Sequence, residues 1–279
     1  MTLLCVDGSN AVHRAYYAVP ALSHNGFPTN AVVGFFSILA KALRETAAND
    51  LVIVFDHPFG TNFRKEIYAE YKAGRDKKPE VTRSLAQQIP VIVKLCRALG
   101  YSIICKRDKE ADDIIGSIAA QYEDGPCHIL SGDKDFAQLL SKSVKIINPN
   151  KGITVTRKNC KDVYGIEPKR VIDYLMLDGD SIDNIQGIDG IGHKTAVALI
   201  EKYGRAEDIP VEAMPKWARE NAAEVKRRLK LNRKLVTIRT DMYRIGDIEL
   251  SIGKPNKEKA LAICSRYGMT RLTAQFSKL

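Results

Sequence analysis

The stretch SGDKDF at residues 131–136 combines residue types that could do chemistry. Asp133 and Asp135 stand two positions apart, directly after the apolar run CHIL at 127–130. Carboxylates this close repel each other and lose hydration when buried, so such a pair is typical of a place where a cation lies between them or where water surrounds both. The rest of the sequence has to decide between these two alternatives.

Carboxylates also follow three further short apolar runs. They are Asp7 after residues 3–6, Asp56 after 51–55, and Glu110, Asp112 and Asp113 in the KEADD that follows 101–105. A single Asp after a strand is often only a turn former or a helix cap. Seven acidic residues in equivalent places are harder to explain in that way.

The elements that must position these carboxylates alternate along the first half of the chain, which predicts an α/β domain with a mainly parallel sheet flanked by helices. The predicted strands are 3–6, 51–55, 101–105, 127–130 and 144–147, and the predicted helices are 30–46, 82–99 and 110–122, with Thr29 and Thr82 as N-caps and Gly100 as a C-cap.

Ligands of parallel sheets bind outside the carboxyl ends of the strands, so we expect the seven carboxylates to converge there. Without a counter-ion, their repulsion would cost on the order of several kcal/mol. Oxygen ligands suit Mg²⁺ or Mn²⁺. Two such ions about 4 Å apart can stabilise the attacking and leaving oxygens of a phosphodiester. We therefore interpret Asp133 and Asp135 as sharing a metal site.

Composition and spacing argue against several other classes of protein. The chain has 279 residues, 45% of them hydrophobic, and a formal net charge of +10, which favours a polyanionic partner. Its histidines and six cysteines lack the spacing of a zinc site or a disulfide framework, and no G-x-S-x-G supports a serine hydrolase. No run is long enough for a membrane span, so a cytoplasmic protein is expected.

The second half of the chain shows short helices between Gly and Pro residues, including a basic helix at 217–235 and a last helix near 256–267. We expect two domains that pack closely, 1–178 and 179–279. The segment 56–81 has little apolar periodicity, and a segment of this length is usually functional or disordered.

A glycine hairpin opens the second domain. Residues 187–196 read GIDGIGHKTA, with Gly190, Gly192, Lys194 and Thr195 as candidate contacts to phosphate. Glycine lets backbone N–H groups approach a phosphate, and the next helix presents its positive end. Taken alone, the hairpin could be a tight turn between helices. A surplus of Lys and Arg over residues 190–240 favours the phosphate-binding interpretation.

The segment 63–79 mixes cations with aromatic rings, including Arg64, Tyr71, Lys72 and Arg75. Rings can stack on bases while cations hold phosphates, a combination that suits single-stranded nucleic acid. The alternative is a solvated, partly helical surface loop.

Taken together, these motifs resemble the 5′ nuclease family, which includes flap endonucleases, stand-alone 5′-3′ exonucleases and the N-terminal domain of bacterial DNA polymerase I. The resemblance spans nearly the whole chain, through VDGSN with Arg14 shortly after it, VFD, FRKEIYAEYKAGR, EADD, SGDKDF, GDSIDNIQGIDGIGHKTA and LNRKLVTIRTD. It implies a PIN-like nuclease domain at 1–178 with a helical arch at about 60–82, and a helical DNA-binding domain at 179–279 with a helix-hairpin-helix.

The resemblance also implies roles for single residues. One divalent cation would lie among Asp7, Asp56, Glu110, Asp112 and Asp113, and a second among Asp133, Asp135, Asp180 and Asp183. Lys72 and Arg75 would act on the scissile phosphate, and Tyr71 would stack on the terminal bases. A potassium ion would bind the carbonyls of Gln186, Ile188 and Ile191. Two residues depart from the polymerase-type pattern: Gln186 replaces a proline, and Asp189 adds a negative charge.

We therefore expect a 5′-3′ exonuclease and flap endonuclease that acts in DNA replication or repair. It would use two Mg²⁺ or Mn²⁺ ions, and Asp112 and Asp133 would be the most important of their ligands for catalysis. The expected partners are DNA with a 5′ flap, a 5′ overhang or a nick, with RNA primer ends as a further candidate, and the expected state is a monomer. A related RNase and a non-catalytic junction-binding module stay open as alternatives. So does the choice between a free-standing enzyme and the front part of a polymerase.

Overall fold

The computed structural model describes residues 1–60, 62–74 and 78–279, and its centre is a six-stranded sheet. The strand order is β5-β4-β1-β6-β7-β8, parallel from β5 to β7 and antiparallel at β8. The strands are β1 (Leu3–Asp7), β4 (Asp50–Asp56), β5 (Ser102–Lys106), β6 (Cys127–Leu130), β7 (Val144–Asn148) and β8 (Ile153–Val155). The mainly parallel sheet predicted from the sequence is therefore confirmed, whereas edge strand β8 was not predicted.

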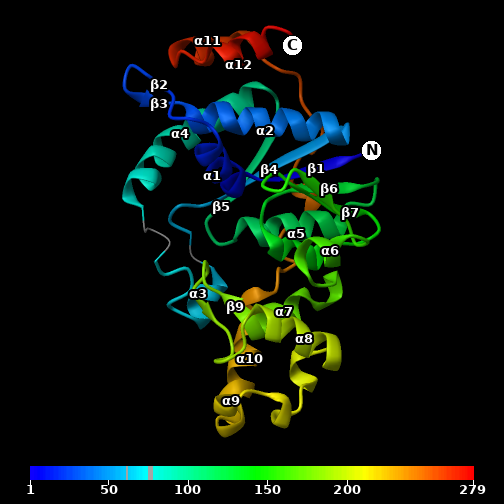
Figure 1. The fold of residues 1–279 in the computed structure, drawn as a ribbon. Helices are drawn as coiled ribbons and strands as arrows, with labels where there is room; N and C mark the ends of the chain where they lie inside the picture. The colour runs from blue at the N-terminus through cyan, green and yellow to red at the C-terminus, as the bar shows by residue number, and fades with distance from the viewer. Residues whose placement is uncertain (61, 75–77) are drawn as a thin grey trace.

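Both faces of the sheet are covered, as alternation along β1 shows. Leu3 and Cys5 belong to one hydrophobic cluster, and Leu4 and Val6 belong to the other. All four are fully buried, as expected for the central strand of a parallel sheet. One face packs against α1 (Gly8–Ala18), α2 (Asn30–Thr46) and α4 (Pro79–Ala98), and the other against α5 (Ala111–Gln121) (Figure 1).

Helix α2 has the predicted bounds, but α4 begins earlier than predicted. Its first residue is Pro79, which suits a first helical turn because that turn has no N–H bond to lose. Thr82 therefore lies inside the helix. Thr29 precedes α2 without a side-chain cap bond. Gly100 follows α4 with φ +75, a left-handed conformation that glycine adopts easily.

The shorter elements of the first half connect these layers. They are β2 (Ser23–His24), β3 (Phe27–Pro28), α3 (Phe63–Ile67) and the 3₁₀ helix η1 (Lys134–Leu139). Helix α3 and the following turns lie below the carboxyl ends of the strands, near β9 (Gly179–Asp180) and α10 (Ala222–Val236) (Figure 1).

The helices of the second half continue the core on the α5 side. They are α6 (Cys160–Tyr164), α7 (Val171–Asp178), α8 (His193–Tyr203), α9 (Lys216–Glu220) and α10 (Ala222–Val236), with the small hairpin β9 (Gly179–Asp180) and β10 (Ile185–Gln186). The predicted basic helix is thus two helices with Asn221 between them. One buried cluster runs from the sheet into these helices, so the two halves share a core.

After α10 the chain returns to the first half. Leu51 N–H donates to the Leu250 carbonyl at 2.7 Å, and Gly253 N–H donates to the Gly100 carbonyl at 2.9 Å. Helices α11 (Lys257–Arg266) and α12 (Thr270–Phe276) then pack on α2 and α4, at the top of Figure 1. Among the described residues, no helix is long and apolar enough to cross a membrane.

Candidate active site

The carboxyl ends of the central strands carry the acidic residues predicted from the sequence. Asp7 ends β1 and Asp56 ends β4, beside it in the sheet. Asp7 is buried and accepts hydrogen bonds from Asn10 N–H at 3.0 Å and from Ser131 Oγ at 2.9 Å. Asp56 Oδ1 accepts from the first N–H of α5, on Ala111, at 3.0 Å. These bonds fix the strand ends to the helices that follow.

Four of these carboxylates form a group of mutually repelling charges, namely Asp7, Asp56, Asp112 and Asp133. Burial, together with the charges of Asp56 and Asp133, raises the pKa of Asp7 to about 7. The pKa of Asp112 is raised well above its ordinary value by burial and by the charge of Asp7. Asp7 and Asp112 are thus more costly to ionise because of the carboxylates around them.

A second group shares Asp133 with the first and adds Asp135, Asp180 and Asp183. Burial is the main cause that raises the pKa of Asp133, followed by the charges of Asp183 and Asp180. The pKa of Asp135 is raised well above its ordinary value, by burial and by the charge of Asp133. Asp180 Oδ1 accepts from Ile182 N–H at 2.7 Å and from Asp183 N–H at 3.1 Å, which holds the turn after β9.

One atom in this second group is a strong sign of a cation. Asp135 Oδ1 is buried and has no hydrogen-bond partner among the described residues. A buried carboxylate oxygen without a partner is costly, and an oxygen-preferring divalent cation would compensate it. The donor set therefore fits Mg²⁺ or Mn²⁺. As the side chains of the described residues stand, however, no three His, Cys, Asp or Glu are gathered closely enough to hold a metal ion.

Lys72 reaches into the acidic groups from the base of the predicted arch. Its ammonium contacts Glu110 Oε1 and lies 3.9 Å from Asp183 Oδ2. Its backbone has φ 59, a left-handed conformation uncommon for a residue other than glycine, and its N–H donates to the Asp183 carbonyl at 2.8 Å. This strained backbone holds the lysine against the acidic side chains.

Tyr71 lies deeper than the sequence suggested. The residue is only 4% exposed, and its hydroxyl donates to Asp183 Oδ2 at 3.1 Å and to Glu110 at 3.3 Å. Its burial among these carboxylates replaces the predicted stacking on terminal bases, because the ring is covered by the protein itself.

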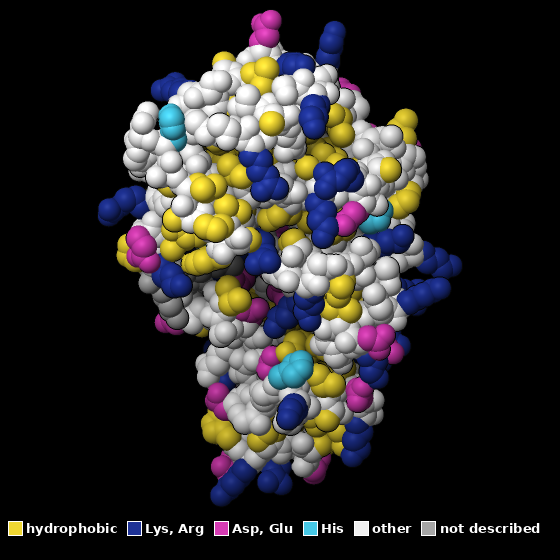
Figure 2. Space-filling view, turned by 45° about the horizontal axis from the view of Figure 1, so that its top comes forward, with side chains coloured by type: hydrophobic (Ala, Val, Ile, Leu, Met, Phe, Trp, Pro, Cys, Tyr) yellow, Lys and Arg dark blue, Asp and Glu magenta, His cyan; other side chains and the backbone are white. Residues whose placement is uncertain are grey.

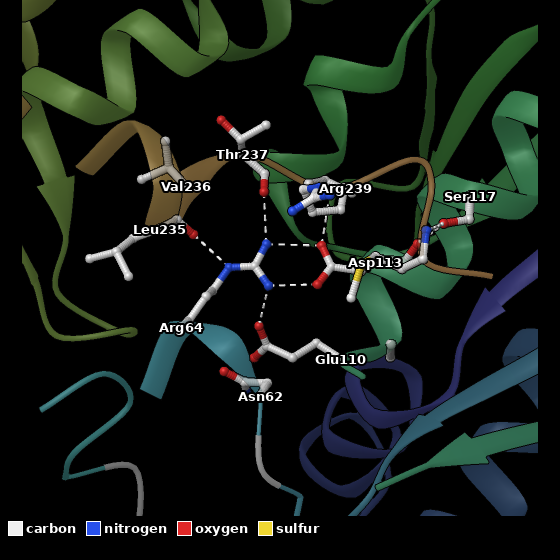
Figure 3. Close-up of polar contacts among 12 residues, drawn as sticks. Asn62, Arg64, Glu110, Asp113, Ser117, Leu235, Val236, Thr237 and Arg239 are labelled. Atoms are coloured by element: carbon white, nitrogen blue, oxygen red, sulfur yellow. Dashed lines mark hydrogen bonds and ion pairs between the residues drawn. The ribbon is translucent and has the colours of Figure 1, made fainter. Parts of the chain in front are cut away.

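The structure also places Arg64 and Asp113 differently from the prediction. Arg64, expected to touch DNA, is 3% exposed and is bonded to Glu110 and Asp113 (Figure 3). Both oxygens of Asp113 accept from its guanidinium, at 2.6 and 2.9 Å, and Oδ1 also accepts from Arg239 N–H. Asp113 is therefore the partner of Arg64 instead of a carboxylate that faces the other acids.

Two further predicted residues remain. Arg75 lies outside the described residues. Arg14 is half-buried on α1. Figure 2 shows acidic side chains in a recess across the middle of the molecule, with Lys and Arg side chains around it.

The predicted glycine hairpin lies between β10 and α8. Ile188 and Ile191 are buried and anchor it, whereas Gly192, Lys194 and Thr195 are exposed at the start of α8. Gly190 is also exposed and has φ +84, which glycine alone adopts readily. The exposed face thus offers backbone N–H groups and a lysine at the positive end of a helix.

The negative charge that Asp189 adds to the hairpin is neutralised from α10. Arg228 donates to Asp189 Oδ2 at 3.3 Å and to the Gly187 carbonyl at 3.2 Å. Gln186 Nε2 donates to Asp189 as well, at 3.1 Å. The two departures from the polymerase-type pattern therefore contact each other.

Asn232, one turn further along α10, donates to the Gln186 and Met176 carbonyls at 2.8 and 3.0 Å. The Gln186 carbonyl, a predicted potassium ligand, thus already accepts a hydrogen bond from the protein. Sequence reasoning counted Arg228 only among the basic residues of 190–240 and missed Asn232. Their spacing of four residues places them on one face of a helix, which was the available signal.

Comparison with known proteins gives a consistent result. Residues 2–165 match the family model for the 5′-3′ exonuclease, N-terminal resolvase-like domain, and residues 166–258 match that for the 5′-3′ exonuclease, C-terminal SAM fold. These models meet at 165/166, before the expected boundary at 178/179.

Two curated relatives show how far the match extends along each protein. The chain is 36% identical to a 5′-3′ exonuclease of Aquifex aeolicus over 282 residues, which is 100% of this chain and 96% of the relative. It is also 36% identical to DNA polymerase I of Bacillus subtilis over 285 residues, which is 97% of this chain but only 32% of the polymerase.

Two solved structures share the fold. The T5 D15 protein, co-crystallised with metal ions, aligns over 100% of this chain and 97% of its own with a TM-score of 0.70 and 22% identity. The catalytic core of Rad2 in complex with DNA substrate aligns over 98% of this chain and 92% of its own, with a TM-score of 0.62 and 16% identity. Fold, family models and relatives agree, and the chain belongs to the 5′-3′ exonuclease family of nucleases.

Proposed function

We propose that this protein is a divalent-metal-dependent 5′ nuclease that cuts DNA near junctions between single strands and duplex, as an exonuclease and a flap endonuclease in replication or repair. The observation that carries the proposal is the excess of buried carboxylates, with Asp135 Oδ1 left without a partner among the described residues. Such an excess needs a cation, and the exposed hairpin that follows β10 offers a site for a phosphate backbone.

In this proposal, Asp7, Asp56, Glu110, Asp112, Asp133, Asp135, Asp180 and Asp183 hold two Mg²⁺ or Mn²⁺ ions, some of them through water. When bound, these ions supply an activated water and stabilise charge on the attacking and leaving oxygens. Asp113 is left out because Arg64 occupies both its oxygens.

The side chains of the chain itself would bind and orient the substrate. Lys72 is held against Glu110, and from that place its ammonium would act on a scissile phosphate beside the cations. Arg75 is proposed as a second cation for this phosphate, and Arg14 as a contact to the backbone. The hairpin, through Gly190, Gly192, Lys194 and Thr195, would grip the duplex without reading bases.

A potassium ion at the carbonyls of Gln186, Ile188 and Ile191 is part of the proposal. Its removal by exchange into lithium salt should weaken duplex binding without changing the cleavage rate of bound substrate. The T5 D15 flap endonuclease has been crystallised as a complex with DNA and metal ions, and that shared fold supports the proposed substrate.

The test is cleavage of a 5′-labelled flap duplex with Mg²⁺, with EDTA, and by the Asp133→Asn variant with Mg²⁺. We expect cutting at the junction only in the first case. Lys72→Ala should cut more slowly by orders of magnitude while still binding DNA.

Other outcomes identify the alternatives. Binding of the flap without any Mg²⁺-dependent cleavage would favour a junction-binding module. Faster cleavage of the same flap made of RNA would favour an RNase.

A further inference from the structure

All the hydrogen-bonding capacity of Arg64 is used inside the protein. A guanidinium has five N–H donors. Nε donates to the Leu235 carbonyl at 2.8 Å, one nitrogen donates to Glu110 and Asp113 at 2.5 and 2.6 Å, and the other donates to Asp113 and to the Thr237 carbonyl at 2.9 and 2.7 Å (Figure 3). Because these five bonds come from one rigid plane, they fix the positions of their acceptors relative to each other.

The two carboxylate oxygens of Glu110 accept from different cations, one from Arg64 and the other from Lys72. Oε2 accepts from Arg64, while Oε1 accepts from Lys72. Arg64 therefore sets the direction in which the carboxylate presents its second oxygen, and with it the place where the Lys72 ammonium lies. A change at Arg64 would reach Lys72 through a single shared carboxylate.

The other two acceptors belong to the second half of the chain. Leu235 is in the last turn of α10, and Thr237 follows the helix. Carbonyls at a helix C-terminus lack partners within the helix, and that end carries partial negative charge, so a guanidinium stabilises it. The same helix holds the hairpin through Arg228 and Asn232. Arg64 thus joins the end of α10 to Glu110.

We propose that Arg64 is a positioning residue for the nuclease reaction: it acts through Glu110 to place Lys72, and it does so only while the end of α10 is docked against α3 and α5. This inference rests on the proposed function, because its measurement is DNA cleavage. It assigns to Arg64 no contact with DNA.

The test is a double-mutant cycle with Arg64→Lys, Lys72→Ala and the double variant. Single-turnover cleavage of the flap with Mg²⁺ and binding of the flap in EDTA are measured for each. Displacement of a positioned group by about 1 Å can cost roughly 100-fold in rate, so Arg64→Lys should slow cleavage by about 10- to 100-fold. Its affinity for DNA should stay within about twofold of wild type, because Arg64 is buried.

The decisive result is the double variant. If Arg64 acts through Lys72, Lys72→Ala already removes its effect, and the double variant cleaves no more slowly than Lys72→Ala alone. If Arg64 only stabilises the fold, the two losses multiply, and the proposal is overturned.

Two controls keep the outcome clear. Arg239→Gln removes a neighbouring guanidinium that is paired with Asp241, and it should cleave within about twofold of wild type. Circular dichroism shows whether each variant is folded, and Asp113→Asn, which loosens Arg64 from its other side, replaces Arg64→Lys in the cycle if that variant unfolds. Failure of wild type to cut would contradict the proposed function, whereas multiplicative losses in an active enzyme would contradict this inference alone.

Discussion

Asp112 and Asp113 are neighbours in the sequence but belong to two acidic regions of opposite character. Asp112 faces the group in which carboxylates raise each other's pKa. Asp113 is bonded through both oxygens to Arg64 and is almost fully buried without an excess of charge. The negative charge of Asp113 is therefore balanced within the protein, whereas the carboxylates around Asp112 need a cation from solution.

The largest expected effect is on cleavage. Asp112→Asn should slow single-turnover cutting of the flap by about three orders of magnitude or more, because it removes a charge that the reaction needs in place. Asp113→Asn should slow it by only about tenfold, through the looser Arg64. Equal losses in the two variants would show that the two regions do not differ in function.

The second expected effect is on stability, where Asp113→Asn should cause a larger loss than Asp112→Asn. Asp113→Asn leaves Arg64 buried with less compensation, and breaking a buried pair costs roughly 3–5 kcal/mol. Asp112→Asn removes a repelling charge and should not lower the free energy of unfolding in EDTA. Urea unfolding of both variants measures this contrast, and a larger loss in Asp112→Asn would refute it.

A third effect concerns pH in EDTA. The folded-state pKa values of Asp7 and Asp112 are raised, so their contribution to stability is complete below the unfolded value near 4 and is lost as pH rises through the folded-state pKa, which is about 7 for Asp7. The free energy gained by Asp112→Asn over wild type should therefore grow as pH rises above about 4. Mg²⁺ should abolish this growth.

The smallest effect tests the hairpin, which lies apart from both acidic regions. Lys194→Ala should weaken binding to the flap duplex a few-fold and reduce the dependence of log K on log salt by about 0.9 for one lost phosphate contact. Cleavage at saturating DNA should be unchanged. Lys254→Ala, an exposed lysine on the returning segment, is the matched control and should bind as wild type does.

The sheet and most carboxylates could be predicted because they depend on local patterns. Apolar runs followed by acids identify the strand ends at Asp7, Asp56 and Asp133, and parallel topology brings such ends together. The contrast between Asp112 and Asp113 could not be predicted, since adjacent residues on a helix give no indication of what covers each one.

The burial of Arg64 could not be predicted for a similar reason. In the sequence it reads as one basic residue of a polar segment, and only its contact with Leu235, 171 positions away, reveals that it is buried. Tyr71 was misjudged for the same reason, because its partner Asp183 lies in the second half of the chain.

The returning C-terminal helices have a consequence for how the chain folds during synthesis. Phe36 on α2 packs against Phe276 on α12, with ring centres 5.5 Å apart, and central strand β1 pairs with β6, which follows much later in the chain. Contacts this distant in sequence slow folding, since long loops must close before the contacts form. A growing chain on the ribosome would therefore expose the apolar surface around Phe36 until α12 emerges, and transiently exposed apolar surface of this kind promotes aggregation.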